Sequence, residues 1–218
     1  MLHDQIREHL IAAILKGDYN EGERIVETRV ARQLGVSQGA VREALRQLEV
    51  LGFLESEPYS GTYVRTHTID DLMEIYPVRA ALESLGARLA LPHLSDEQID
   101  KLEKLVGDMV RLSESGDVRG MVERNFEFHK AIINASGNSM LIRSWGLFQF
   151  SYWTTVTTTE LQSQLAYLAQ RHYAIIEALR SRDPQRAARA LHEHILELRQ
   201  MLSQREAETT SAPSQFEA

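Results

Sequence analysis

The fold of the N-terminal part is decided by residues 31–49, ARQLGVSQGAVREALRQLE. This stretch predicts two helices, one over 27–34 and one that begins after Ser37, joined by a short turn. Gly35 permits the turn, and Ser37 is a favourable N-cap for the second helix. Apolar residues then recur at helical spacing and predict the buried face of that helix: Val41, Leu45, Leu48 and Leu51.

The neighbouring segments complete a small domain. An apolar pattern with helical spacing over residues 2–15 predicts a preceding helix. Two β-prone segments, 53–54 and 62–64, flank a turn at 58–61 and predict a hairpin. Three helices followed by a small hairpin are the parts of a winged helix-turn-helix, so we expect residues 1–66 to form such a domain.

The composition excludes several classes of protein. The chain has 218 residues, of which 43% are hydrophobic and 25% charged, and it has no Cys. No apolar run approaches the roughly 18–20 residues that span a bilayer, and the first ten residues lack the apolar segment of a signal peptide. We therefore expect a cytoplasmic protein with no membrane partner. Any metal must be held by His, carboxylate or amide oxygen.

The net charge decides little about partners. The formal charge of −7, from 24 basic and 31 acidic residues, argues at first against nucleic acid, because phosphate binding depends on Lys and Arg. Residues 1–66 contain 8 of the basic and 10 of the acidic residues, so neither part of the chain is strongly charged. A local basic face therefore stays compatible with the acidic total.

The rest of the chain predicts an all-helical bundle over residues 67–206. The helices are expected over 69–92, 96–115, 118–135, 138–158, 160–182 and 184–205. Ser95 with Gln98 has the spacing of a capping box, and Pro77 is expected to kink the first long helix or to mark its start. The polar tail, 207–218, is expected to be disordered. The predicted fold class is thus mainly α.

The helix that begins after Ser37 carries the pattern of a DNA-reading helix. Arg42 and Arg46 lie four residues apart on the face opposite the apolar stripe. The N-terminal end of such a helix meets the base edges, where Gln38 could pair with adenine. The candidate DNA contacts are Arg29, Ser37, Gln38, Gly39, Arg42, Arg46 and Gly61. The alternative is a merely packed domain with solvated Arg residues, in which Arg42 pairs with Glu43 or Glu49.

The same segments resemble the winged helix-turn-helix of GntR-family regulators. The resemblance rests on 22–27 (GERIVE), 31–37 (ARQLGVS), 41–49 (VREALRQLE), 52–54 (GFL) and 61–64 (GTYV). It implies that the helix from Ser37 enters the major groove, with Arg29, Gln38 and Arg42 at the contact positions of the family. Gln38 stands where the family often has Arg, so the operator sequence does not follow from the resemblance.

Three His residues in the second part have the spacing of a metal site. His172 and His194 lie 11 residues on either side of Asp183, at a predicted helix–helix turn. On an antiparallel hairpin both would lie about 16 Å from the turn and could face each other. Asn125 and His129 share one face of another helix, so all four side chains could bind Zn²⁺, Ni²⁺ or a similar ion. The alternative is a set of ordinary core His residues.

This part resembles the FCD effector domain of the FadR subfamily. The matching segments are 76–83 (YPVRAALE), 125–129 (NFEFH), 135–138 (ASGN) and the stretch from His172 to Ile195. With the winged domain, the resemblance covers residues 5–202. It implies a divalent metal held by an acidic residue and three His; Zn²⁺ is the expected ion, with Ni²⁺ and Mn²⁺ as alternatives. Asn125 stands where Asp is usual, which removes one negative charge and favours an anionic effector.

The expected effector is a small organic acid bridged between the metal and Arg79. The resemblance places Arg79 at an Arg that faces the ligand cavity. Tyr76 and Trp153 are candidates for the cavity wall, and their alternative role is plain core packing. Glu83 lies four residues after Arg79, so it could simply pair with that Arg.

These features together predict a ligand-responsive transcription factor, with repression as the expected mode. It would bind a palindromic double-stranded DNA operator as a homodimer, because two-fold proteins match two-fold sites. The alternative is a metal-dependent hydrolase or lyase that uses His129, His172 and His194 to activate water. No HExxH motif occurs and no general base accompanies the three His, which favours the regulator. A third possibility is a purely structural metal.

Overall fold

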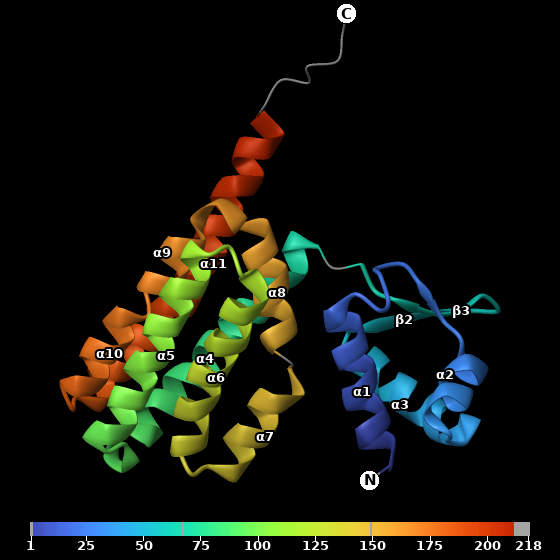
Figure 1. The fold of residues 1–218 in the computed structure, drawn as a ribbon, viewed down its shortest axis with the longest axis horizontal. Coiled ribbons are helices and arrows are strands. Elements are labelled where there is room, and N and C mark those ends of the chain that lie inside the picture. The colour runs from blue at the N-terminus through green and yellow to red at the C-terminus, as the bar shows by residue number, and fades with distance from the viewer. Residues whose placement is uncertain (1, 67, 149, 212–218) are drawn as a thin grey trace, which may run out of the picture. The chain divides into compact units, whose positions relative to one another are not determined.

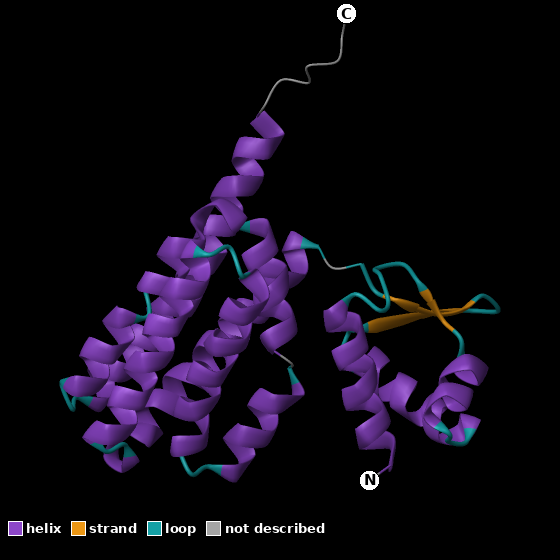
Figure 2. Ribbon diagram, viewed as in Figure 1, coloured by secondary structure: helices purple, strands orange, loops and turns teal. Residues whose placement is uncertain are grey.

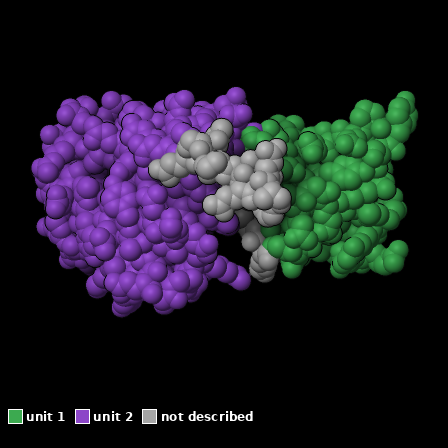
Figure 3. Space-filling model, turned by 90° about the horizontal axis from the view of Figure 1, so that it is seen from above, with its two compact units in different colours: residues 1–68 green, residues 69–218 purple. Residues whose placement is uncertain are grey.

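The computed structural model describes residues 2–66, 68–148 and 150–211. The chain divides into two compact units, residues 1–68 and 69–218 (Figure 3). Both are mainly helical, as predicted, and among the residues just given all strands lie in the first unit (Figure 2). Within the described residues, no helix is long and apolar enough to cross a membrane.

Unit 1 is built around helix α3 (Gln38–Val50), which packs against α1 (Leu2–Lys16) and α2 (Glu27–Leu34) (Figure 1). The turn before α3 is the predicted one. Gly35 has a left-handed backbone (φ 66°) at the end of α2, and the Ser37 hydroxyl accepts the amide of Ala40 at 3.2 Å. The face of α3 that packs inward is fully buried and consists of Val41, Ala44, Leu45 and Leu48.

A three-stranded antiparallel sheet completes unit 1. Its strands are β1 (Arg24–Ile25), β2 (Leu54–Glu57) and β3 (Gly61–Val64), in the order β1-β3-β2. The hairpin of β2 and β3 was predicted, and its register pairs Leu54 with Val64. Strand β1 was not predicted, because two residues are too short a segment to show an alternating pattern.

Unit 2 is a helical bundle in which α4 packs along α11 and α6, and α5 packs along α6 (Figure 1). Pro77 lies inside α4 and does not mark its start. Ser95 and Gln98 cap α5 reciprocally, as predicted. The elements are α4 (Ile69–Ala90), η1 (Leu91–His93), α5 (Asp96–Glu114), α6 (Val118–Ala135), α7 (Ser139–Leu147), α8 (Phe150–Glu160), η2 (Gln162–Gln164), α9 (Leu165–Gln170), α10 (Tyr173–Arg180) and α11 (Pro184–Ser211).

The prediction of a single long helix is wrong for two segments of unit 2. The segment 138–158 is divided into α7 and α8, and the segment 160–182 into η2, α9 and α10. At the second break the His172 ring bonds to the Ala169 carbonyl at 3.0 Å. A side chain that hydrogen-bonds to the backbone competes with the helical hydrogen-bond pattern. The apolar spacing continues across the break, so the sequence did not indicate it.

The predicted disordered tail is also corrected in part. Helix α11 continues through residues 207–211, which include Ala207 and Glu208, both favourable in helices. Residues 212–218 lie outside the described part of the chain.

We expect Gly35→Ala to destabilise unit 1 by about 1–2 kcal/mol, because a Cβ is strained in the left-handed conformation. No atom lies within 4 Å of that Cβ, so the effect is one of backbone strain alone. Both Trp residues, Trp145 and Trp153, lie in unit 2, so hydrogen–deuterium exchange of α2 and α3 is the appropriate measurement.

Gly39→Ala is the matched control for this substitution. Gly39 lies in α3, and its Cβ would meet only the Ser37 hydroxyl at 4.0 Å. Protection of α2 and α3 is expected to be unchanged or higher in this variant. Equal loss of protection in both variants would contradict the role assigned to the turn.

Candidate functional site

The candidate DNA contacts lie on one unit and are largely open to solvent. Ser37 and Gln38 stand at the N-terminal end of α3, with Gly39 next, and the side chains of Arg29, Arg42 and Arg46 are exposed. Gly61 lies at the start of β3 and is half-buried. Gly61 has a φ of 133°, which L side chains rarely adopt, and a Cβ there would also lie 2.6 Å from Nε of Arg24, so the position favours Gly.

Arg42 is held by a carboxylate that its sequence neighbourhood did not indicate. Its Nε donates to Oε1 of Glu27 at 3.1 Å and its Nη2 to Oε2 at 2.8 Å, a bidentate pair between α3 and α2. The alternative partners considered above, Glu43 and Glu49, are not the ones observed. The hydrogen bonds and charge of Glu27 raise the pKa of Arg42 above its ordinary value. The guanidinium is thus charged and oriented at the surface of unit 1.

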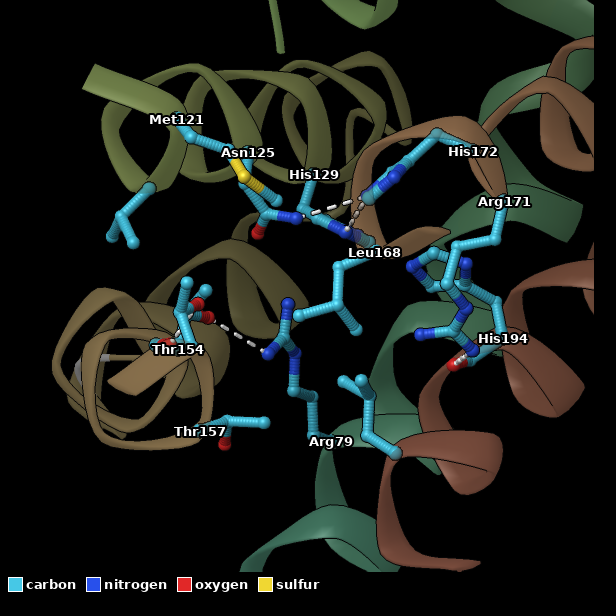
Figure 4. A pocket seen from close by; sticks show the side chains of 13 residues that line it. Arg79, Met121, Asn125, His129, Thr154, Thr157, Leu168, Arg171, His172 and His194 are labelled. Carbon is cyan, nitrogen blue, oxygen red and sulfur yellow. Dashed lines mark hydrogen bonds between the residues drawn. The ribbon is translucent and has the colours of Figure 1, made fainter. Parts of the chain in front are cut away.

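Unit 2 contains a cavity between its central helices (Figure 4). About 20 Å³ of it is open to water-sized atoms, enough for one ion or about one water. Its wall includes two Arg and three His but no carboxylate. The lining residues are Arg79, Met121, Val122, Asn125, His129, Thr154, Thr157, Thr158, Leu168, Arg171, His172, His194 and Leu198.

The three predicted His residues converge in this cavity. His129 comes from α6, His172 from the turn between α9 and α10, and His194 from α11, and all three are buried. One ring nitrogen of each lies within 4.8 Å of the others. Nε2 of His129 and Nε2 of His172 are 3.4 Å apart, and Asn125 Nδ2 is 2.9 Å from His172 Nε2. The structure therefore brings the four predicted ligands together.

The hydrogen-bond partners of two rings determine which nitrogens face inward. His172 Nδ1 is 3.0 Å from the Ala169 carbonyl, so it carries the proton and leaves Nε2 with a lone pair. His129 Nδ1 lies 2.5 Å from Oε2 of Glu83, so the carboxylate favours the tautomer with the proton on Nδ1, and Nε2 faces His172. Burial lowers the pKa of His129, and that of His172 and His194 well below the usual value. Neutral imidazoles with inward lone pairs are metal ligands.

This donor set fits a divalent metal. When both rings carry their proton on Nδ1, the two Nε2 lone pairs face each other across 3.4 Å, and a cation between them removes their repulsion. Nitrogens bound tetrahedrally to Zn²⁺ at 2.0–2.1 Å are about 3.3 Å apart, close to the observed separation. The Oδ1 atom of Asn125 is buried and has no hydrogen-bond partner within the described part of the chain. Rotation of that amide would turn an unused oxygen toward the three rings.

Glu83 lies on the side of His129 that faces away from the cavity, and it orients the side chains of His129 and Arg79. Its Oε1 accepts Nε of Arg79 at 2.8 Å and Nε1 of Trp145 at 3.1 Å, while its Oε2 faces His129. Burial acts to raise the pKa of Glu83, but His129 and Arg79 outweigh this effect and lower it below its ordinary value. The pairing with Arg79 was anticipated from their spacing. The contact with His129 was missed, because it depends on how α4 packs against α6.

The predicted effector residues divide into one at the cavity and two behind it. Arg79 lines the cavity and donates to the Thr154 hydroxyl at 3.0 Å. Tyr76 and Trp153 are buried but are not among the lining residues; the Tyr76 hydroxyl bonds to that of Thr157, and the Thr157 hydroxyl donates to the Trp153 carbonyl. Their positions therefore agree with the alternative interpretation, in which both are ordinary core residues.

Two groups of lining residues were missed in the sequence. Arg171 directly precedes His172, and its adjacency to a candidate ligand was the available signal. The Thr hydroxyls at 154, 157 and 158 have i, i+3 and i+4 spacing, which marks one helix face and was the available signal. His192, two residues before His194, is exposed and does not belong to the cavity lining.

The cavity lacks the groups that hydrolysis would need. Glu127, on the same helix as His129, is exposed and pairs with Arg124 at 2.5 Å. Glu83 lies behind the His129 ring, where its Oε1 accepts from Arg79 and Trp145 and its Oε2 forms an ion pair with His129 Nδ1. No carboxylate belongs to the described lining residues, so no acidic side chain there can act as a general base beside a metal-bound water.

Family models match both units. Residues 2–64 match the model described as bacterial regulatory proteins, gntR family, and residues 74–197 match the FCD domain. The chain is 33% identical to the "Probable D-xylose utilization operon transcriptional repressor" of Paenarthrobacter nicotinovorans, over 88% of this chain and 84% of that protein. It is 31% identical to the Uxu operon transcriptional regulator of Escherichia coli, over 87% and 82%.

A solved structure shows the same fold. Escherichia coli McbR/YncC superposes with a TM-score of 0.75 over 94% of this chain and 99% of that chain, at 24% identity. The relatives are named as regulators of transcription, and neither family model describes an enzyme. The chain belongs to the GntR family of bacterial regulatory proteins, with a winged helix-turn-helix followed by an FCD domain, and it is a DNA-binding transcriptional regulator.

Proposed function

We propose that this regulator is a repressor that binds a palindromic operator as a homodimer and responds to a small carboxylate at a metal site. The observation that carries the proposal is the cavity of unit 2. Three neutral imidazoles and two Arg line it, and no acidic side chain does. Such a wall favours an anion, and the repressor named among the relatives supports the mode of regulation.

Asn125, His129, His172 and His194 are proposed to hold the metal, with Zn²⁺ as the expected ion. When bound, the ion supplies positive charge and open positions that an acid group can occupy. All four ligands are neutral, so the protein does not offset the charge of the ion. Arg79 lies in the same cavity and is proposed to bind the effector carboxylate.

The signal is proposed to travel along α4. Arg79 and Glu83 lie on this helix, which begins at Ile69, where unit 2 begins. An effector that binds Arg79 therefore acts on the element that follows the DNA-binding unit directly in the chain. Operator affinity changes only if the effector prefers one of two arrangements of that element.

On the DNA side, α3 is proposed to enter the major groove. Arg29, Ser37, Gln38, Gly39, Arg42, Arg46 and Gly61 are the proposed contacts. Because the chain carries a formal charge of −7, non-specific attraction to DNA is weak. Operator affinity is therefore proposed to depend on base contacts and on dimerisation.

Arg42→Ala is expected to weaken operator binding by about 10- to 100-fold, the contribution of one good bidentate base contact. The measurement is a gel shift with the DNA upstream of the protein's own gene. Arg111→Ala is the control, because Arg111 is also exposed and paired, to Asp108, but lies in unit 2. Unchanged retention by the Arg42 variant would contradict the recognition-helix assignment.

The double variant His129→Ala/His194→Ala is expected to lose the bound metal, because two of three imidazoles are removed. Elemental analysis of the purified full chain measures the occupancy. His192→Ala is the control, since His192 is exposed and two residues from His194. Full occupancy in the double variant would disprove the ligand set.

Asn125→Asp is expected to tighten Zn²⁺ binding by at least about tenfold, because it places a negative charge beside the ion. Competition with a chelator measures the affinity. Asn134→Asp, an exposed substitution on the same helix, controls for general charge. Equal Zn²⁺ affinity in wild type and both variants would show that residue 125 is not a ligand.

A further inference from the structure

The cavity of unit 2 lies next to a groove on the surface of the same unit. The groove is formed by residues of α9, α10 and α11 and by Arg171, and about 820 Å³ of it is open to water-sized atoms. Arg171 and His194 line both the groove and the cavity, and Figure 4 shows these two side chains on the same side of the cavity. Their two side chains therefore form the wall that separates the cavity from the groove.

The cavity is too small for an organic acid as it stands. Its 20 Å³ compares with roughly 300 Å³ or more for ordinary ligand pockets. A ligand larger than an ion must displace a side chain. Among the described lining residues, Arg171 and His194 also border the groove, so each has room to move away from the cavity. His194 belongs to the proposed metal ligands. Arg171 is thus the wall residue that can move without repacking the core.

Arg171 is held by groups at the outer surface. Its Nε and Nη2 donate to Oε2 of Glu197 at 2.9 and 2.5 Å, and Nη2 also donates to the His194 carbonyl. The Tyr167 hydroxyl bonds to the other oxygen of Glu197. The Arg171 side chain is 5% exposed, whereas that of Glu197 is 36% exposed. The buried cation is therefore neutralised by a carboxylate that water reaches.

The two cavity cations differ in how easily their partners can be replaced. The partner of Arg79 is Glu83, which is 1% exposed and also bound by His129 and Trp145. Removing it would leave several buried polar groups without partners. The partner of Arg171 is at the surface, so an incoming carboxylate can take its place. One guanidinium–carboxylate pair is then exchanged for another and the charge balance is kept.

We propose that Arg171 is the entrance to the cavity and a second anchor for the effector, released from Glu197 when an acid group takes over its guanidinium. The inference rests on the proposed function of the cavity and assigns it a route and a further binding residue. Glu197 acts as the competitor that keeps the entrance closed in the absence of an anion.

The first test follows access to the cavity with Zn²⁺ alone. The full chain is loaded with Zn²⁺, and its release to excess EDTA is timed for wild type, Glu197→Gln and Arg171→Met. Both variants are expected to release the ion about fivefold faster, the size that loss of one partly exposed ion pair supports. Glu103→Gln is the control, because it removes a surface partner of Arg180, and neither residue lines the cavity or the groove.

The second test separates an anchor from a merely structural ion pair. Binding of malonate and of D-gluconate to the Zn²⁺-loaded proteins is measured by calorimetry. Glu197→Gln is expected to tighten binding by about threefold or more, because the competitor is gone, and Arg171→Met to weaken it by about tenfold. Arg171→Lys is expected to fall between wild type and Arg171→Met, since Lys keeps the charge but not the planar geometry.

If the Arg171–Glu197 pair were only structural, Glu197→Gln and Arg171→Met would both weaken anion binding. A loss of anion affinity in Glu197→Gln would therefore overturn the role of Arg171 as an anchor. Release rates and affinities equal to wild type in both variants would overturn the inference and leave the proposed function standing. If the wild-type protein binds neither Zn²⁺ nor either acid, the proposed function fails as well. Thermal unfolding by circular dichroism verifies that each variant is folded.

Discussion

The buried carboxylate of Glu83 is the interaction on which the centre of unit 2 depends. A lone carboxylate in this position would be costly, because burial removes its hydration. Arg79, Trp145 and His129 replace the lost water, and through them Glu83 connects α4 with α6 and α7. The same contacts leave the Arg79 guanidinium at the cavity and direct Nε2 of His129 inward. One carboxylate thus stabilises the packing and prepares the site.

The electrostatics of the cavity follow from this arrangement. Glu83 neutralises Arg79 from behind, Glu197 neutralises Arg171 from outside, and neither carboxylate reaches the lining. The wall itself presents neutral imidazoles, an amide, Thr hydroxyls and two cations. The Thr hydroxyls at 154, 157 and 158 donate to carbonyls of their own helix, so they offer lone pairs and not protons. A site of this kind discriminates by charge first and by hydrogen bonding second.

Unit 1 uses a related device in a different setting. Glu27 holds Arg42 with two hydrogen bonds and so limits the conformations of a long side chain on an exposed helix. An oriented guanidinium loses less entropy when it binds a partner. In both units, an acidic residue positions the Arg that is proposed to meet an anion; Glu27 lies on the neighbouring helix α2, whereas Glu83 lies on the same helix as Arg79. The acidic composition is therefore compatible with two anion-binding surfaces.

Local chemistry made much of this protein predictable from its sequence. The caps at Ser37 and Ser95 act within one turn of helix, and Gly35 acts through its own backbone. The equal spacing of His172 and His194 about Asp183 indicated that they could meet, since residues equally far from the turn of a helix hairpin lie at the same distance along the helix axes. Both family resemblances rest on such local segments.

Only the tertiary structure decided which groups surround these side chains. The contact of Glu83 with His129, the pairing of Arg42 with Glu27 and the position of Arg171 between cavity and groove join residues from different helices. Tyr76 and Trp153 lie behind the cavity for the same reason. Periodicity specifies the face of a helix that is buried but not its partner, and the partner is set by how the helices pack.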